Sequence, residues 1–190
     1  MYFAVMKAQP WQAKEYVKDG ATYPAVRVSH TNATDFGDKL TTVARKAGVL
    51  SVKEKIALPT EAQWEWAARA GTTTAYVSGP DDSKLGDFAW YDKNAWSIGE
   101  KYAHEVGKKK PNAWGLLDIS GNYWEWCSDW YAVKLPGGTN PTGPTAGSSR
   151  ALRGGSFFDG TFGSRVGYRN NFVPAFVYYL IGFRVVVCVE

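Results

Sequence analysis

Tryptophan and glycine are both unusually frequent in this chain, which has nine Trp and 20 Gly among 190 residues. Glycine-rich stretches form long connections, and such connections become ordered only where large side chains give them a surface to pack on. We therefore expect ordered loops held by buried indole rings, with few regular elements. The length suits a single domain over residues 1–190, because folding at that size buries roughly two-thirds of the unfolded surface.

The first helix signal lies between a short predicted strand at 23–28 and Gly48, the expected stop. Thr31 or Asn32 can cap this helix. Apolar residues at helical spacing predict its buried stripe, which comprises Phe36, Leu40, Val43 and Ala47.

The second helix signal is stronger and lies in LPTEAQWEWAARAG (58–71). Thr60 is the predicted N-cap, Gln63 completes a capping box, and Gly71 marks the C-terminal end. Trp64, with Ala67 and Ala68, is expected on one buried face. Trp66 is also expected to pack, as most Trp side chains do.

Strand signals follow the helices. In YWEWCSDWY (123–131), Trp124, Trp126 and Trp130 alternate as they would on one face of a strand against the core. Residues 151–153 and 183–189 are further short strands. Residues 72–111 and 134–149 carry Gly, Pro, Asp and Asn without periodicity, which predicts loops.

Charge and cysteine content exclude several classes. The net charge is +4, and the densest basic run, Lys108 to Lys110, ends at Pro111 as a solvated turn would, so we expect no nucleic-acid partner. Cys127 and Cys188 stand among apolar residues, which favours buried free thiols over a single disulfide. No apolar run approaches the roughly 20 residues of a transmembrane helix. We expect a monomer, with a leader or lipid anchor removed ahead of Met1.

Five blocks of the sequence, in order, resemble the formylglycine-generating enzyme or sulfatase-modifying-factor domain. They are LPTEAQWEWAARAG (58–71), PNAWGLLDISGNYWEWCSDWY (111–131), NPTGP (140–144), RALRGGSF (150–157) and GFRVV (182–186). Five ordered blocks are far more specific than one short motif. The resemblance implies an α+β variant of the C-type lectin fold: two helices, a small twisted antiparallel sheet and long ordered loops.

The activity of that family does not transfer with the resemblance. The family's oxidase chemistry depends on a cysteine pair soon after the RGGS block, which binds copper, and residues 157–181 contain no cysteine. His30 and His104 stand alone, so we expect no cofactor, no metal and no enzyme. The family also binds calcium at a block matching Asp118, Gly121, Tyr123 and Glu125. The alternative is that Asp118 and Glu125 only hydrogen-bond the loop.

Residues 157–181 lack Lys, Glu, Gln, Trp and Met. At their frequency elsewhere in the chain, about five would be expected in a segment of this length. Diversity-generating retroelements replace adenines, mostly in AAC or AAT codons, and the resulting pyrimidine-ended codons encode every amino acid except these five. The segment resembles the variable region of such elements' variable proteins, of the treponemal type, which lies at the same place on this fold.

The resemblance divides the segment in two. Seven residues match the family's invariant pattern: Arg165, Val166, Arg169, Pro174, Ile181, Gly182 and Phe183. Fourteen further residues form the predicted variable, exposed, ligand-binding set: Phe158, Asp159, Gly160, Phe162, Gly163, Tyr168, Asn170, Asn171, Phe172, Val173, Ala175, Phe176, Tyr178 and Tyr179. The segment holds eight aromatic residues, and such side chains give large contact area at low entropy cost.

The sequence therefore predicts a display protein at a bacterial cell surface or outside the cell, binding a protein or surface ligand through 158–179. Two alternatives stay open. One is an oxidase or related enzyme of the parent family, and the other is an accessory domain without a selected ligand. In the second case the aromatic residues of 157–181 would belong to an ordinary core.

Overall fold

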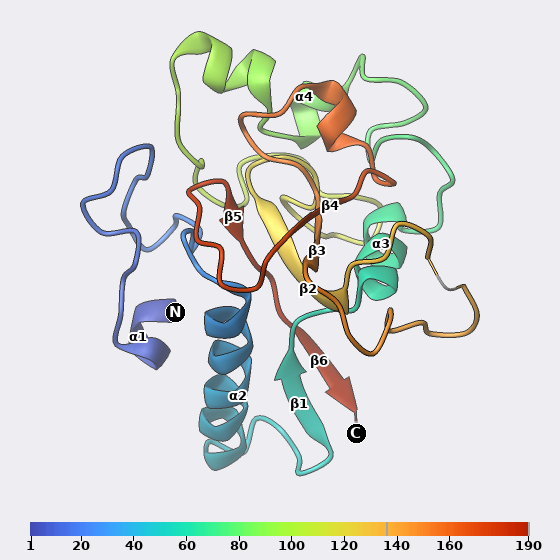
Figure 1. Cartoon of the computed structure of the whole chain (residues 1–190). Helices are drawn as coiled ribbons and strands as arrows, with labels where there is room; N and C mark the ends of the chain where they lie inside the picture. Colours follow the sequence, from blue (N-terminus) through green and yellow to red (C-terminus); the bar gives the residue numbers. More distant parts are fainter. Residues whose placement is uncertain (136, 190) are drawn as a thin grey trace.

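The computed structural model describes residues 1–135 and 137–189; Pro136, within the predicted loop 134–149, and Glu190 lie outside the described residues. The centre of the molecule is a four-stranded sheet in the order β4-β3-β2-β5 (Figure 1). Its strands are β2 (Trp124–Trp130), β3 (Arg150–Arg153), β4 (Asn170–Phe172) and β5 (Ile181–Gly182). Strand β3 is antiparallel to both β2 and β4, and the short β5 runs parallel to β2.

A second sheet pairs the first and the last strand of the described chain. Strand β1 (Glu54–Ala57) pairs antiparallel with β6 (Val186–Val189), and helix α2 (His30–Lys46) lies alongside β1 (Figure 1). The predicted strand at 183–189 is thus divided between β6 and the loop that precedes it. Strand β1 was not predicted, because its four residues show no alternation.

Helix α3 (Glu61–Arg69) has the predicted start. The Thr60 hydroxyl accepts from the Gln63 amide, and the Gln63 side chain accepts from the Thr60 amide, so the capping box is confirmed. Trp64 is buried as expected, but Trp66 is 69% exposed, so its expected burial is wrong. Two positions apart on a helix, the two indoles point in different directions, and only Trp64 faces the sheet.

Helix α2 begins earlier than predicted, with Ser29 rather than Thr31 or Asn32 as its N-cap. The predicted stripe is partly wrong, since Val43 is exposed and Ala47 lies beyond the helix and is exposed too. The buried face is instead made by residues that follow the capped register, namely Ala33, Phe36, Gly37, Thr41 and Ala44.

The predicted strand at 23–28 is absent. Arg27 has a φ of 56°, a left-handed conformation that no strand accommodates, and its amide donates to the carbonyls of Tyr178 and Ile181. A tertiary contact therefore overrides the local pattern of this segment.

The rest of the described chain is largely loop with single helical turns, as predicted for 72–111. These turns are α1 (Tyr2–Met6), α4 (Leu85–Phe88), η1 (Asp92–Asn94), η2 (Trp96–Ile98) and η3 (Thr161–Ser164). No helix in the described ranges is both long and apolar enough to cross a membrane.

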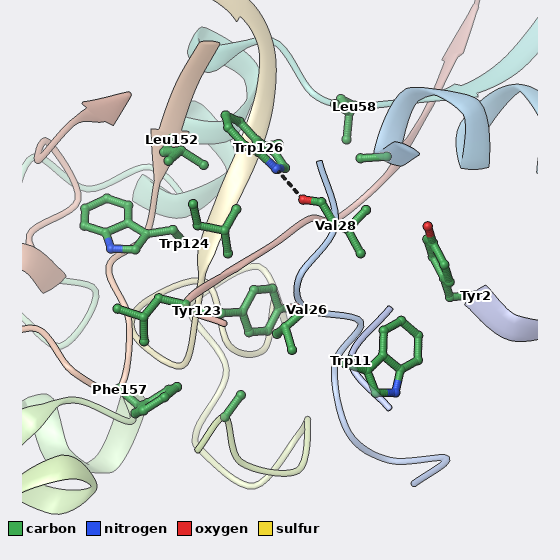
Figure 2. Packing of buried hydrophobic residues seen from close by; sticks show 14 of the residues in the cluster. Tyr2, Trp11, Val26, Val28, Leu58, Tyr123, Trp124, Trp126, Leu152 and Phe157 are labelled. Atoms are coloured by element: carbon green, nitrogen blue, oxygen red, sulfur yellow. Dashed lines mark hydrogen bonds between the residues drawn. The ribbon is translucent and has the colours of Figure 1, made fainter. Parts of the chain in front are cut away.

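Buried aromatic rings hold the loops against the sheet, as the composition predicted (Figure 2). Trp124 and Trp126 are both buried, and the Trp126 indole donates to the carbonyl of Val28 at 2.9 Å. Trp130 is only half-buried, because the β2–β3 register shifts between Trp126 and Trp130. The strand prediction for 123–131 is otherwise confirmed.

Candidate ligand-binding surface

The segment 157–181 forms one continuous path over the end of the four-stranded sheet, coloured orange to red in Figure 1. It leaves the core at Phe157, which is fully buried, passes through η3 and β4, and returns to the core at Ile181 in β5. Both ends of the segment are therefore part of the hydrophobic core, and most of the residues between them are exposed or half-buried.

Side-chain exposure varies along this path. The most exposed large apolar side chains are Phe158 (45%), Phe162 (58%), Val173 (51%), Val177 (44%) and Tyr178 (36%). Gly160 and Ala175 are also exposed. The remaining predicted display residues apart from Gly163 are half-buried: Asp159, Tyr168, Asn170, Asn171, Phe172, Phe176 and Tyr179.

Gly163 was predicted to be exposed and is buried. A Cβ atom there would lie 2.7 Å from the Cβ of Asp159, so the backbone of η3 closes tightly on that residue. Asp159 in turn accepts hydrogen bonds from the Ser156 amide, at 2.9 Å, and from the Ser156 hydroxyl. Burial raises the pKa of Asp159. Both residues shape the turn more than they present a surface.

The aromatic side chains of the segment contact one another. Phe172 and Phe176 stack with ring centroids 4.3 Å apart, and Tyr178 lies 5.6 Å from Phe176 and 4.4 Å from Tyr179. Phe172, Phe176 and Tyr179 also pack on the main core cluster. The result is an aromatic surface with one side supported and the other side in solvent.

The main chain of the segment is bound to the rest of the protein at regular intervals. The Asp92 amide donates to the carbonyl of Asp159 at 2.9 Å, and the His30 amide donates to the carbonyl of Pro174 at 3.0 Å. The Val166 amide donates to the carbonyl of Ala75 at 2.9 Å. These bonds use backbone atoms, so they do not depend on which side chain stands at the position.

Strand β4 extends this main-chain attachment. Leu152, Ala151 and Arg150 of β3 pair with Asn170, Asn171 and Phe172 in an antiparallel ladder. The pairing was not predicted, because the three residues of β4 carry no strand signal of their own. A sheet edge places them through backbone hydrogen bonds alone.

Two arginines tie the middle of the segment to helix α3. Arg169 binds Glu61 with both ends of its guanidinium, at 2.5 and 2.7 Å, and donates to the carbonyl of Ala132 at 2.8 Å. Arg153 of β3 has a fully buried side chain, pairs with Glu65 and donates to the carbonyl of Tyr168 at 2.9 Å. The sequence analysis missed Arg153, although its place in the RALRGGSF block was the available signal.

The other residues matched to the invariant pattern differ in burial. Val166 and Ile181 are buried, and Pro174 is half-buried. Gly182 is buried, and the position requires glycine, because a Cβ there would lie 2.7 Å from the carbonyl oxygen of Ala25. Phe183 is half-buried and its ring packs on Phe36, with centroids 5.2 Å apart.

Among the seven residues matched to the invariant pattern, Arg165 alone is exposed. None of the ion pairs among the described residues includes it. Val177 is exposed as well, although the predicted display set omitted it. Valine has pyrimidine-ended codons, so the codon argument could have included this position.

The thiol chemistry of the resembling family has no counterpart in the described structure. Cys127 and Cys188 are both free, as expected, but only Cys127 is buried and Cys188 is half-buried. Burial raises the pKa of Cys127 well above its usual value, which leaves it a neutral thiol in the core. The two cysteines lie on strands of different sheets, β2 and β6, and neither belongs to 157–181.

The calcium site implied by the resemblance does not fit these residues. Each oxygen of the Glu125 carboxylate accepts from Arg184 at 2.6 Å, and one also accepts from the Trp64 indole at 2.6 Å. Asp118 accepts from the Gly107 amide at 2.7 Å, and burial raises its pKa. Calcium takes roughly six to eight oxygen ligands, whereas the Glu125 carboxylate is already neutralised by a guanidinium. The described residues contain no cluster of three or more His, Cys, Asp or Glu side chains that could hold a metal.

Comparison with known proteins identifies the family to which this architecture belongs. Residues 4–189 match the model of the sulfatase-modifying factor enzyme 1-like domain. The formylglycine-generating enzyme of Streptomyces coelicolor is 34% identical over 161 residues, which cover 78% of this chain and 46% of that enzyme. The Mycobacterium tuberculosis enzyme of the same name is 32% identical, with 77% and 50% covered. The chain thus spans about half the length of these relatives.

Solved structures agree with the fold. Treponema denticola variable protein 1 superposes with a TM-score of 0.85 at 32% identity, covering all of this chain and 80% of that protein. PvdO from Pseudomonas aeruginosa gives a TM-score of 0.74 at 26% identity, over 90% of this chain and 63% of that protein. The predicted α+β fold, the C-type lectin variant found in formylglycine-generating enzymes, is confirmed.

Proposed function

Because this chain belongs to the family of sulfatase-modifying factor enzyme 1-like domains, we propose that it is a non-enzymatic member that displays a diversified binding surface. The surface is the solvent side of residues 158–179. Its ligand is a protein or another molecule of a cell surface, and the side chains that contact it differ from copy to copy of the gene. We place the protein at the bacterial surface or outside the cell, as a monomer held by a lipid anchor on a leader.

The observation that carries the proposal is the way the segment is held. Its backbone is bonded by groups outside it at Asp159, Tyr168 and Tyr178, three of the predicted display positions. Each bond uses the carbonyl and not the side chain, although the Asp159 carboxylate is itself bound by the Ser156 amide and hydroxyl. A segment attached in this way keeps its path when its side chains are exchanged, and a diversified surface requires that property.

The chemistry of the exposed side chains supports recognition. Phe158, Phe162 and Tyr178 place aromatic rings in solvent along the same short segment. Exposed aromatic side chains on an ordered backbone are typical of binding surfaces, because they contribute contact area and lose little rotamer entropy.

The same surface argues against the activity of the enzyme relatives. Residues 157–181 contain no cysteine, and Cys127 is a buried neutral thiol elsewhere in the sheet. We expect no conversion of the cysteine in a sulfatase-derived peptide to formylglycine, with or without added copper. Mass spectrometry of the peptide after incubation measures this, with a Cys188→Ala variant as control. Turnover that disappears in the variant would show that the chain is an enzyme.

Sequencing the DNA around the gene tests the display function directly. We expect a reverse-transcriptase gene and a template repeat that differs from the codons of 157–181 only at adenines. Further copies of the gene should differ at the codons for the display positions. A locus without a template repeat, combined with copies that are identical across the segment, would favour the accessory domain.

A further inference from the structure

A small pocket opens beside the aromatic surface, between the end of helix α3 and the turn η3. Its volume is about 390 Å³. The lining residues are Arg69, Thr73, Thr74, Ala75, Phe162, Arg165, Gly167 and Tyr168. Two of the eight are arginines and none is acidic, so the pocket is positively charged.

Arg165 is the centre of this pocket. Its guanidinium lies over the ring of Phe162, 4.7 Å from the centroid, and 5.8 Å from the centroid of Tyr76. The Nε atom donates to the hydroxyl of Tyr76 at 3.2 Å. The two aromatic rings and this bond hold the guanidinium in place, and no carboxylate among the described residues pairs with it.

Arg69 supplies the second charge from the last turn of α3. It pairs with Glu65 at 2.7 Å, and Glu65 is shared with the buried Arg153. Arg153 also pairs with Glu61, which binds Arg169, so two carboxylates face three guanidinium groups and do not neutralise all of them. Gly167 has no side chain, and a Cβ there would lie 3.7 Å from the Arg69 guanidinium, so the backbone leaves Arg69 accessible from the pocket.

The exposure of Arg165 needs an explanation beyond stability. Arg169, the other arginine of the segment, is committed to Glu61 and to backbone carbonyls. The side chain of Arg165 has no ion pair and donates only to the Tyr76 hydroxyl among the described residues, although the resemblance matches it to an invariant position. A guanidinium that is positioned by aromatic rings and left with free N–H groups is arranged to receive a planar anion.

We propose that this pocket is a constant subsite that binds the carboxylate of an acidic side chain on a protein ligand. The inference rests on the proposed function and adds the chemistry of its ligand. Arg69, Thr73 and Thr74 lie outside the variable segment, whereas Phe162 and Tyr168 lie within it. Arg165 matches the invariant pattern, and Tyr76, which accepts its hydrogen bond, also lies outside the segment, so the pocket offers the same charged contact in every copy. The neighbouring variable rings select which acidic ligands fit.

The test uses a rhodamine-labelled, C-terminally amidated peptide of alternating glycine and glutamate, titrated with the full chain and followed by fluorescence anisotropy. The matched peptide carries glutamine in place of glutamate. We expect only the glutamate peptide to bind at low salt. Arg165→Gln and Arg69→Gln should each raise its dissociation constant about tenfold. Arg165→Lys should recover only part of the loss, because an ammonium cannot bind a carboxylate with a planar fork.

The control is Lys39→Gln, which removes one positive charge from an exposed position on helix α2. We expect this variant to bind within about twofold of the parent chain, because Lys39 does not line the pocket and cannot form the paired hydrogen bonds that a guanidinium makes with a carboxylate. Thermal unfolding of each variant shows that the fold is intact. Equal binding of the two peptides, or an equal loss in Lys39→Gln and Arg165→Gln, would overturn the subsite. Neither result bears on the gene locus, which tests the display function separately.

Discussion

Phe157 and Phe158 are adjacent and chemically identical, but they lie on opposite sides of the start of the proposed display surface. Phe157 is 0% exposed and belongs to the main core cluster, whereas Phe158 is 45% exposed and touches the edge of Trp96. Phe157→Ala should therefore lower the free energy of unfolding by about 3–5 kcal/mol, because it leaves a cavity. Phe158→Ala removes only about half of a buried side chain and should cost about 1 kcal/mol.

Urea denaturation followed by tryptophan fluorescence measures both values, and the nine Trp residues give a strong signal. The slope of unfolding free energy against urea concentration should be the same in both variants, so that the midpoint shift reports stability. The difference between the two variants matters more than either value, since neighbouring phenylalanines share the same unfolded-state environment. Equal losses, or a larger loss in Phe158→Ala, would refute the boundary and make the segment's aromatics part of an ordinary core.

Two further predictions concern the scaffold. Trp64→Ala should lower the free energy of unfolding by about 3–5 kcal/mol, because the buried indole fills the core and donates to Glu125. Trp66→Ala, at an exposed position, should lower it by about 1 kcal/mol or less. Similar urea midpoints for the two variants would contradict the assigned faces of α3. Burial, with Arg150 contributing, lowers the pKa of His30 from 6.5 to about 4, so the unfolded chain takes up the proton at the higher pH. The free energy of unfolding should therefore fall between pH 6.5 and pH 4, and His30→Gln should flatten part of that fall; an unchanged pH profile in the variant would show that His30 is not responsible.

Local signals predicted the elements that local interactions build. The capping box of Thr60 and Gln63 marks the start of α3, because its two bonds join residues three apart in the sequence. The alternating indoles of 123–131 mark β2, since Trp124 and Trp126 point into the same core cluster. In each case the residues that specify the element are also the residues that compose it.

Tertiary contacts decided the elements that were predicted wrongly or not at all. The segment 23–28 alternates like a strand, but Arg27 turns to a positive φ, with its amide donating to Tyr178 and Ile181. Strand β4 shows the reverse case, since its three residues have no strand signal and become a strand by pairing with β3. Both partners lie far away in the sequence, so no local pattern could specify them.

The limits of the candidate surface come from the sequence, whereas the burial of each position comes from the structure. Composition located 157–181, because a missing set of residue types is visible along the sequence. Composition does not give the burial of single positions, and the family resemblance placed Gly163 in solvent and Arg165 among the residues that hold the fold. The structure shows Gly163 closed against Asp159 and Arg165 open beside a charged pocket. Exposure depends on how the backbone folds over the sheet, and a list of allowed residue types does not encode that path.

A recognition surface that changes between copies must separate the atoms that vary from the atoms that hold the fold. In this domain the division runs between backbone and side chain within the same residues. The carbonyl of Tyr178 accepts from Arg27 while its ring lies at the surface, and the carbonyl of Asp159 accepts from Asp92. The half-buried rings of Phe172 and Phe176 limit the separation, because they pack on the core. If the segment is diversified as proposed, volume constrains the residues at such positions, and we expect the freest variation at Phe158, Phe162 and Tyr178.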